Sequence, residues 1–374
     1  MTPTATRHRI VSRGDLPGSD GGVYNPGAIV EGDAIVLIAR REIDYRFTSI
    51  VHAERIVVDP RTLDVVAHRT LRRIGYSDDA RIEDFRSIRH RGETLVVHTM
   101  VHADRIRPVL ARADETSITF VGELEMPFAT TRIEKNWVLF EHHGELHCLY
   151  RLEPLTILAR EGGGRWRVCK RDHLAWPTGF PASLSNSSNL VPFEGGHLGF
   201  WHARVDERYV QGAMLLDEKL DIVAATGVLL DGRDAAPGQK AGVLYVSSLV
   251  VHDGRVLAFY GEGDAHTGVA ILDAAALADA LRRHAFVPRR PVTIRLAPTS
   301  MGELFRAMVA LEALRNEQGD RALWTHVPDA NLHDVVRRFG VRELTVRDLA
   351  ERSRFDYDVG SLLAAAAPAA SRRS

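Results

Sequence analysis

The sequence has very little cysteine and no excess of charge of either sign. Of its 374 residues only Cys148 and Cys169 are cysteines, which argues against a disulfide scaffold and against a thiolate zinc cluster. The 48 lysine and arginine residues are balanced by 49 acidic residues, so the formal net charge is −1. A chain with this balance has no overall attraction for nucleic acid or for an anionic membrane. We therefore expect no nucleic-acid partner.

Long apolar runs and nucleotide-binding loops are missing as well. No stretch approaches the ~20 apolar residues that a membrane-spanning helix needs, and the opening MTPTATRHRIVSRGD lacks the apolar core of a secretion signal. Neither a GxxxxGK[ST] loop nor a GxGxxG turn after a strand occurs. These absences predict a cytoplasmic protein without a membrane span and without a nucleotide cofactor.

What the sequence does contain is a repeated pattern of strand, glycine turn and strand. The repeats are 52–60 residues apart, and each glycine separates two apolar strands. The turn glycines are Gly32, Gly92, Gly144, Gly196 and Gly254. Self-similarity at a period of about 40–60 residues, with strands in each unit, is typical of a β-propeller. The sequence therefore predicts an all-β fold, a five-bladed β-propeller over residues 21–288.

The pattern changes at both ends of the chain. Residues 1–20 show no strand pattern and are expected to be an irregular leader. Near the other end, AAALADALRRHAF predicts a short helix, and MGELFRAMVALEALRNEQ places Leu304, Phe305 and Met308 on one face of an amphipathic helix. We expect residues 289–374 to form an α-helical C-terminal appendage with a disordered tail, through which the protein could form homo-oligomers.

A polar side chain stands seven or eight residues before each of the five glycines. These side chains, each at the start of an otherwise apolar strand, are Asn25, Asp84, Asn136, Asn189 and Ser247. The innermost strands of a propeller line its central channel, so the five positions would ring one mouth of that channel. Alternatively, Asn, Asp and Ser could simply begin strands and satisfy the turn backbone locally.

Asp84 is the only acid in this ring. It follows Glu83, and a carboxylic acid beside a second carboxylate can have its pKa raised and act as a general acid. The alternative is a surface ion pair between Asp84 and Arg86.

The strands that follow the turns end in basic and aromatic residues. Trp201 and Tyr260 could form a stacking wall for a sugar. Cationic or cationisable groups that could hold a phosphate are Lys135, Arg151 and His202. The alternative interpretation is a set of core aromatics and a solvated charged rim. The histidines of EHHGELH lie on a predicted β-turn rather than at i, i+4 on a helix, so we predict no metal site.

Taken in order, these motifs resemble glycoside hydrolase family 130. YNPGAI, EDFR, KNW, a strand ending in His202, YVQGAMLLD and YGEGDAHTGVA follow one another at blade spacing over roughly residues 25–270. The resemblance implies a five-bladed propeller that carries an inverting β-mannoside phosphorylase or a β-mannosidase. It leaves the C-terminal segment uncovered.

The resemblance also implies roles for single residues. EDFR is similar to the family's EDPR, which makes Asp84 the counterpart of the acid that protonates the leaving oxygen. The motifs imply phosphate contacts for Arg151 and His202, with Lys135 as a weaker candidate. From the ring and the motifs together, the residues expected to bind the sugar are Asn25, Arg41, Glu83, Asn136, Trp201, Tyr260 and Asp264.

Two departures from the family leave the second reactant open. Phe85 replaces the proline of EDPR, and SNSSNL stands where many members carry a phosphate-binding loop. Phosphorolysis would use inorganic phosphate or a sugar phosphate as a co-substrate rather than a bound cofactor. An inverting hydrolase would need a second carboxylate about 6.5–9.5 Å from the acid. Candidates for it are Glu83, Glu134, Glu262 and Asp264.

The sequence therefore predicts a carbohydrate-active enzyme that cleaves or forms β-mannosidic or similar bonds with inversion. A glycoside phosphorylase acting on an oligosaccharide or a sugar phosphate is the first hypothesis. The alternatives are a β-mannosyltransferase that uses an activated sugar donor, a β-mannoside hydrolase and a non-catalytic glycan-binding propeller.

Overall fold

The structure is a computed structural model, and it divides into two compact units. One comprises residues 1–171 and 181–287, and the other comprises residues 172–180 and 288–374. The residues that the structure describes are 3–44, 51–77, 80–101, 105–128, 130–161, 165–172, 174, 176, 180–181, 183–283, 292–295, 300–318, 323–326, 342–343 and 357–358.

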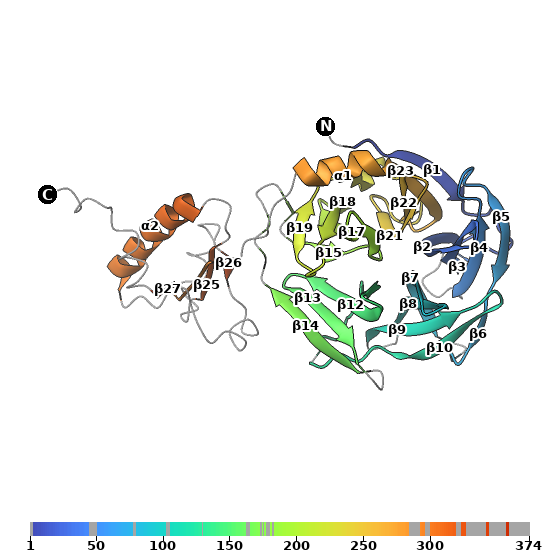
Figure 1. The fold of residues 1–374 in the computed structure, drawn as a ribbon, viewed down its shortest axis with the longest axis horizontal. Helices are drawn as coiled ribbons and strands as arrows, with labels where there is room; N and C mark the ends of the chain where they lie inside the picture. The colour runs from blue at the N-terminus through green and yellow to red at the C-terminus, as the bar shows by residue number, and fades with distance from the viewer. Residues whose placement is uncertain are drawn as a thin grey trace. The chain divides into compact units, whose positions relative to one another are not determined.

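The first unit is a five-bladed β-propeller, which confirms the predicted fold (Figure 1). The first blade consists of β2 (Gly22–Glu31), β3 (Ala34–Glu42), β4 (Val51–Val58) and β5 (Val65–Thr70). The second consists of β7 (Arg81–His90), β8 (Glu93–Val101), β9 (Ile106–Ala113) and β10 (Ser117–Glu123), with β6 (Arg72–Ile74) parallel to β10. The third consists of β11 (Val138–His142), β12 (Glu145–Leu152), β13 (Leu155–Arg160) and β14 (Trp166–Asp172).

The last two blades complete the ring. The fourth is built on β17 (Gly196–Val205), β18 (Arg208–Leu216) and β19 (Ile222–Ala225), to which β15 (Ser185–Asn186), β16 (Val191–Phe193) and β20 (Leu230–Asp231) add short pairings. A 3₁₀ turn, η2 (Gly232–Asp234), follows β20. The fifth blade consists of β21 (Leu244–His252), β22 (Arg255–Glu262), β23 (His266–Asp273) and β1 (Thr6–Val11).

Strand β1 closes the ring, so the prediction of an irregular leader is wrong for Thr6–Val11. The strand pairs antiparallel with β23, from Thr6 opposite Ile271 to Val11 opposite Thr267. It forms the outer edge of the fifth blade (Figure 1). Its sequence TRHRIV is charged, as exposed edge strands commonly are, and this composition hides the strand pattern in the sequence.

The predicted turn glycines are found in all blades but one. Gly32, Gly92, Gly144 and Gly254 all have positive φ values, between +57° and +82°. In the fourth blade the turn glycine is Gly195, with φ +75°, and Gly196 already belongs to β17. A side chain at Gly196 would lie 2.0 Å from the carbonyl oxygen of Leu216, so glycine is needed there for a different reason.

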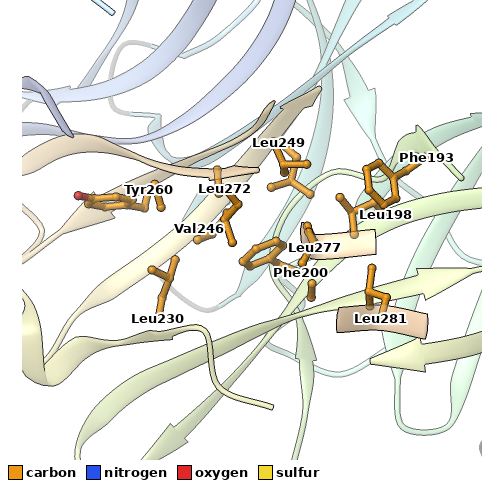
Figure 2. Packing of buried hydrophobic residues seen from close by; sticks show 14 of the residues in the cluster. Phe193, Leu198, Phe200, Leu230, Val246, Leu249, Tyr260, Leu272, Leu277 and Leu281 are labelled. Carbon is orange, nitrogen blue, oxygen red and sulfur yellow. The ribbon is translucent and has the colours of Figure 1, made fainter. Parts of the chain in front are cut away.

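A short helix, α1 (Ala274–Arg283), follows the last blade and confirms the first predicted helix. It begins after Asp273, whose Oδ1 accepts a hydrogen bond from the Ala276 amide at 2.7 Å, a typical N-cap interaction. Leu277 and Leu281 of α1 are buried in the core cluster of the fourth and fifth blades, near Phe200 (Figure 2). The helix thus covers apolar surface that these two blades share.

The second unit is not purely helical, in contrast to the prediction. Helix α2 (Met301–Gln318) is accompanied by a parallel sheet in the order β26 (Arg342–Glu343), β25 (Leu323–His326), β24 (Val292–Arg295) and β27 (Tyr357–Asp358). These strands have only two to four residues, too few for a visible alternation. Of the residues predicted to share one apolar face, Leu304 and Met308 are buried, but Phe305 is 70% exposed. The expected disordered tail lies outside the described residues. Within the described chain, no helix has the length and apolar character needed to cross a membrane.

Candidate active site

Three of the predicted ring residues share an unusual backbone conformation. Asn25, Asp84 and Asn136 have φ values of +50°, +55° and +64°. The first two lie where the strand register shifts, between Tyr24 and Gly27 and between Glu83 and Arg86. A left-handed residue in a bulge turns its side chain out of the strand alternation. All three residues line one cavity of about 700 Å³.

The cavity receives residues from all five blades and has a polar wall. Seven residues that the sequence singled out line it, namely Asn25, Glu83, Asp84, Lys135, Asn136, His202 and Asp264. Further lining residues that were not among the predicted site residues include Arg40, Ser185, Arg204, Tyr209, Lys240 and Tyr245.

Asp84 is anchored on one side and open on the other. The amide Nδ2 of Asn25 donates to Asp84 Oδ1 at 2.7 Å. Among the described residues, nothing donates to Oδ2. Gly261 leaves the room that the Asn25 side chain occupies, because a Cβ at position 261 would lie 1.9 Å from Asn25 Oδ1. The site therefore holds a half-buried carboxyl group in a defined orientation with one oxygen left for a ligand.

Arg40, rather than the predicted Arg41, faces the cavity. Arg40 is 6% exposed, and its guanidinium forms ion pairs with Glu42 and with Glu83, at 3.2 Å to Glu83 Oε1. Arg41 instead forms an ion pair with Glu54 at 3.1 Å and donates to Thr70 at 2.8 Å on the outer strands of the blade. Successive residues of a strand point to opposite faces of its sheet. The prediction of Arg41 was therefore wrong by one residue, and that residue points away from the cavity.

The predicted aromatic wall is absent from the cavity. Trp201 is fully buried, and Tyr260 is only 2% exposed and packs in the core of the last two blades. The Tyr260 hydroxyl accepts a hydrogen bond from Arg7 Nε at 3.1 Å. Both aromatics therefore support the fold, which is the core alternative that the sequence had left open.

Arg151 also lies outside the set of residues that line the cavity. Its guanidinium stacks 4.5 Å from the ring centroid of Tyr150 and donates to the Tyr150 hydroxyl at 2.8 Å. The structure therefore does not bring Arg151 together with Lys135 and His202, contrary to the predicted group of three phosphate ligands.

Most cations that line the cavity are already paired with a carboxylate. Lys240 contacts Asp264 at 2.8 Å, and this partner raises the pKa of Lys240 although burial opposes the shift. Arg204 pairs with Glu207. In the described part of the chain, Lys135 is the one lining cation without an ion pair, and it is exposed. It is therefore the cation available to an anionic ligand.

His202 lines the cavity as a neutral imidazole. Its side chain is buried, and this burial, assisted by the positive charges of Arg86 and Lys135, lowers its pKa to about 3. At neutral pH it can donate or accept a hydrogen bond but carries no charge. The structure thus places His202 at the cavity but not as the cationic phosphate ligand that the sequence suggested.

Two of the five ring residues are structural. Asn189 donates to the carbonyl of Leu249 at 3.2 Å and accepts from the Leu249 amide at 2.6 Å. Ser247 donates to the carbonyl of Pro26 at 2.7 Å. Both side chains satisfy the backbone of an inner strand in a neighbouring blade, rather than a local turn as the alternative interpretation had it, and neither lines the cavity.

The proposed ion pair between Asp84 and Arg86 is absent from the described residues. Arg86 is 2% exposed and meets the main-chain carbonyl of Asp84 at 3.5 Å, not its carboxylate. It also donates to the Tyr245 hydroxyl and, at 3.2 Å, to Asn136 Oδ1. The sequence offered one signal for Tyr245, its position two residues before the ring residue Ser247.

The candidate second carboxylates separate into two groups. Glu83 and Asp264 line the cavity, each in an ion pair. Glu134 instead accepts hydrogen bonds from the Tyr150 hydroxyl at 3.1 and 3.2 Å, and Glu262 pairs with arginines of β1. The histidines of EHHGELH lie outside the cavity, and within the described residues no group of three or more potential ligands is arranged to hold a metal ion.

Comparison with known proteins identifies relatives in fold only. No protein-family model matches the chain, and no curated protein matches it. The β-1,2-mannobiose phosphorylase from Listeria innocua shares the fold with a TM-score of 0.60 and 13% identity, over 74% of this chain and 99% of that one. A structure from the GH130 family of mannoside phosphorylases, described as containing glycoside hydrolases that target β-1,2-mannosidic linkages, has a TM-score of 0.52 and 13% identity, over 67% of this chain and 84% of that one. Similarity at this level of identity establishes the shared propeller.

Proposed function

We propose that this protein is a carbohydrate-active enzyme that cleaves or forms a β-mannosidic or closely similar bond with inversion, with inorganic phosphate as the second reactant. The observation that carries the proposal is the carboxyl group of Asp84, which lies on a bulge in a polar cavity and is held through one oxygen by Asn25. The shared fold with a β-1,2-mannobiose phosphorylase supports the choice of substrate class.

In the proposed reaction, Asp84 is the general acid. Its protonated carboxyl group donates the proton to the leaving glycosidic oxygen, directly or through a sugar hydroxyl, as the bond from the anomeric carbon to that oxygen breaks. A phosphate oxygen attacks the anomeric carbon from the opposite face. The products are a sugar 1-phosphate of inverted configuration and the freed sugar, and Asp84 regains its proton from solvent. Asn25 donates to the carboxylate that forms.

The remaining residues fit binding roles around this acid. Glu83, Asn136 and Asp264 offer acceptors and donors for sugar hydroxyls, since they line the same cavity. Lys135 is the cation that has no carboxylate partner among the described residues, and neutral His202 can add a hydrogen bond. We assign the phosphate to these last two residues.

Hydrolysis is the second candidate, because two carboxylates besides Asp84 line the cavity. However, Glu83 is bound by Arg40 at 3.2 Å and by Arg81 at 3.1 Å, and Asp264 by Lys240 at 2.8 Å. A carboxylate held in an ion pair is a weaker base for activating water. Phosphorolysis, which needs no such base, is therefore the first choice.

The test is to incubate the protein with β-mannobiose, with and without phosphate, and to follow the products by NMR. We expect α-mannose 1-phosphate that forms only when phosphate is present. Asp84→Asn should lower the rate at least ~100-fold, and Asn tolerates the left-handed backbone, so the bulge should persist. Asp206→Asn is the matched control, because Asp206 is also left-handed but lies outside the set of cavity-lining residues.

Other outcomes would select among the alternatives. Turnover without phosphate would identify a hydrolase, and turnover that requires a sugar-nucleotide donor would identify a mannosyltransferase. Binding of glycan without turnover, unchanged by Asp84→Asn, would indicate a glycan-binding propeller. Retained phosphorolysis in Asp84→Asn would refute the role of Asp84.

A further inference from the structure

Arg86 and Tyr245 fix the orientation of the Asn136 amide. Arg86 Nη2 lies 3.2 Å from Asn136 Oδ1, and the Tyr245 hydroxyl lies 3.1 Å from the same oxygen. A guanidinium can only donate hydrogen bonds, so the Asn136 atom that faces it must be the oxygen rather than the nitrogen. The Tyr245 oxygen accepts from Arg86, which leaves its own proton for Asn136. The chemistry of the partners therefore decides which way this amide points.

The consequence is that Asn136 offers only donors to the cavity. Two hydrogen bonds occupy both lone pairs of Oδ1. Among the described residues, Asn136 Nδ2 has no acceptor, and the residue lines the cavity with Lys135 beside it. This part of the wall therefore presents an amide N–H pair and an ammonium group, both of which require an acceptor on the ligand.

The two supporting residues are themselves held firmly. Arg86 is 2% exposed, and its Nε donates to the carbonyl of Ser187 at 2.8 Å. Tyr245 is 6% exposed, and its ring packs edge-on against His202 with centroids 5.0 Å apart. Burial raises the pKa of Tyr245 to about 12, so its hydroxyl keeps its proton throughout the neutral range. The orientation of Asn136 is thus preset before any ligand arrives.

We propose that Arg86 and Tyr245 are positioning residues that orient Asn136 so that its Nδ2 group donates to an acceptor oxygen of the ligand beside Asp84. The inference rests on the proposed function only in assuming that this ligand is the sugar or the phosphate. A sugar hydroxyl oxygen and a phosphate oxygen share the required chemistry, so the two are tested separately.

The test uses Tyr245→Phe, which removes one donor to Oδ1 and leaves the ring in place. The side-chain amide of Asn136 is observed by NMR in protein labelled with ¹⁵N-asparagine, with its signal assigned through Asn136→Asp. Titration of the wild type with inorganic phosphate, and separately with methyl β-mannoside, should shift this signal for the ligand that it binds. Tyr245→Phe should weaken the affinity for that ligand about tenfold, the loss expected for one hydrogen bond.

Two further variants complete the test. Tyr76→Phe is the matched control, because it removes a hydroxyl that is bonded to His98 at 2.8 Å in another part of the propeller; it should keep wild-type affinity. Asn136→Asp keeps an acceptor for Arg86 and Tyr245 but replaces the amide N–H pair with an oxygen. It should keep the melting temperature and lose at least as much affinity as Tyr245→Phe.

The inference is overturned if Tyr245→Phe or Asn136→Asp binds both ligands as tightly as the wild type. It is also overturned if the protein binds phosphate and methyl β-mannoside and neither ligand moves the Asn136 signal. Because this readout requires no turnover, its outcome is independent of the proposed reaction. An inactive protein whose Asn136 amide still responds to a ligand would refute the proposed phosphorolysis and leave the positioning role intact.

Discussion

Asn25, Asp84 and Asn136 adopt left-handed backbone conformations at the inner ends of three successive blades. This conformation costs most residues roughly 1–2 kcal/mol, and Asn and Asp tolerate it best. Strain of this kind tends to be kept where it positions functional groups. Here it is shared by three residues that line one cavity, two of them at bulges within strands and the third, Asn136, just before β11. The recurrence of Asn or Asp at this place in the first three blades fits this backbone requirement.

At the residue scale, Lys135 provides the test of the phosphate assignment. Lys135→Gln removes the one lining cation that has no ion pair within the described chain. We expect the KM for phosphate to rise about tenfold, with little change in the KM for the glycoside, because a single charged hydrogen bond is lost. Steady-state kinetics with each reactant varied in turn measures both constants. Equal effects on the two constants would contradict the assignment.

At the scale of elements, β1 joins the two ends of the propeller and contacts a carboxylate that also holds a loop of the site. Arg7 and Arg9, on the same face of β1, both pair with Glu262 of β22, with 2.8 Å between Arg9 and the carboxylate. Glu262 also accepts the amide of Ala236 at 2.8 Å, in the loop that leads to Lys240 at the cavity. One buried carboxylate therefore holds both the ring closure and a loop of the site.

The variant Glu262→Gln tests how much this carboxylate contributes to the stability of the closed propeller. Glu262 is 2% exposed, and removal of its charge leaves two arginines without their carboxylate, so we expect a loss of stability of ~2–3 kcal/mol. Chemical denaturation measures the free energy of unfolding. Glu194→Gln, which removes an exposed ion pair with Arg282, is the matched control and should cost less than ~1 kcal/mol. Similar small losses in both variants would show that the ion pairs of Glu262 with Arg7 and Arg9 contribute little to stability.

The arrangement of strands could be anticipated from sequence, but their faces and distant partners could not. Gly32, Gly92, Gly144 and Gly254 mark turns that recur in each blade, and local sequence is enough to specify such turns. Arg40 and Arg41 could not be distinguished because a shift of one residue reverses the face. Arg7 could not be connected with Glu262 because 255 residues separate them.

At the scale of the whole molecule, buried histidines make stability depend on pH. Burial lowers the pKa of His98 to about 4 and, with Arg86 and Lys135, that of His202 to about 3. In the unfolded chain both titrate near 6.5, so below that pH the unfolded state binds protons that the folded state does not. Stability must therefore fall as the pH is lowered from about 6.5 toward 4.

Calorimetry at pH 7 and at pH 4.5 measures this dependence through the melting temperature. We expect a lower melting temperature at pH 4.5, and a smaller decrease in His98→Gln, which removes one of the buried titrating groups. A melting temperature that is constant over this range, or an equal decrease in the variant, would contradict the assignment of neutral buried histidines.

The central claim, that Asp84 protonates the leaving oxygen, can be tested by changing the leaving group. Dinitrophenolate departs without protonation, whereas the sugar released from β-mannobiose needs a proton. We expect Asp84→Asn to lower the rate with β-mannobiose at least ~100-fold and the rate with dinitrophenyl β-mannoside less than about fivefold. The same large loss with both substrates, or no loss with either, would contradict the claim.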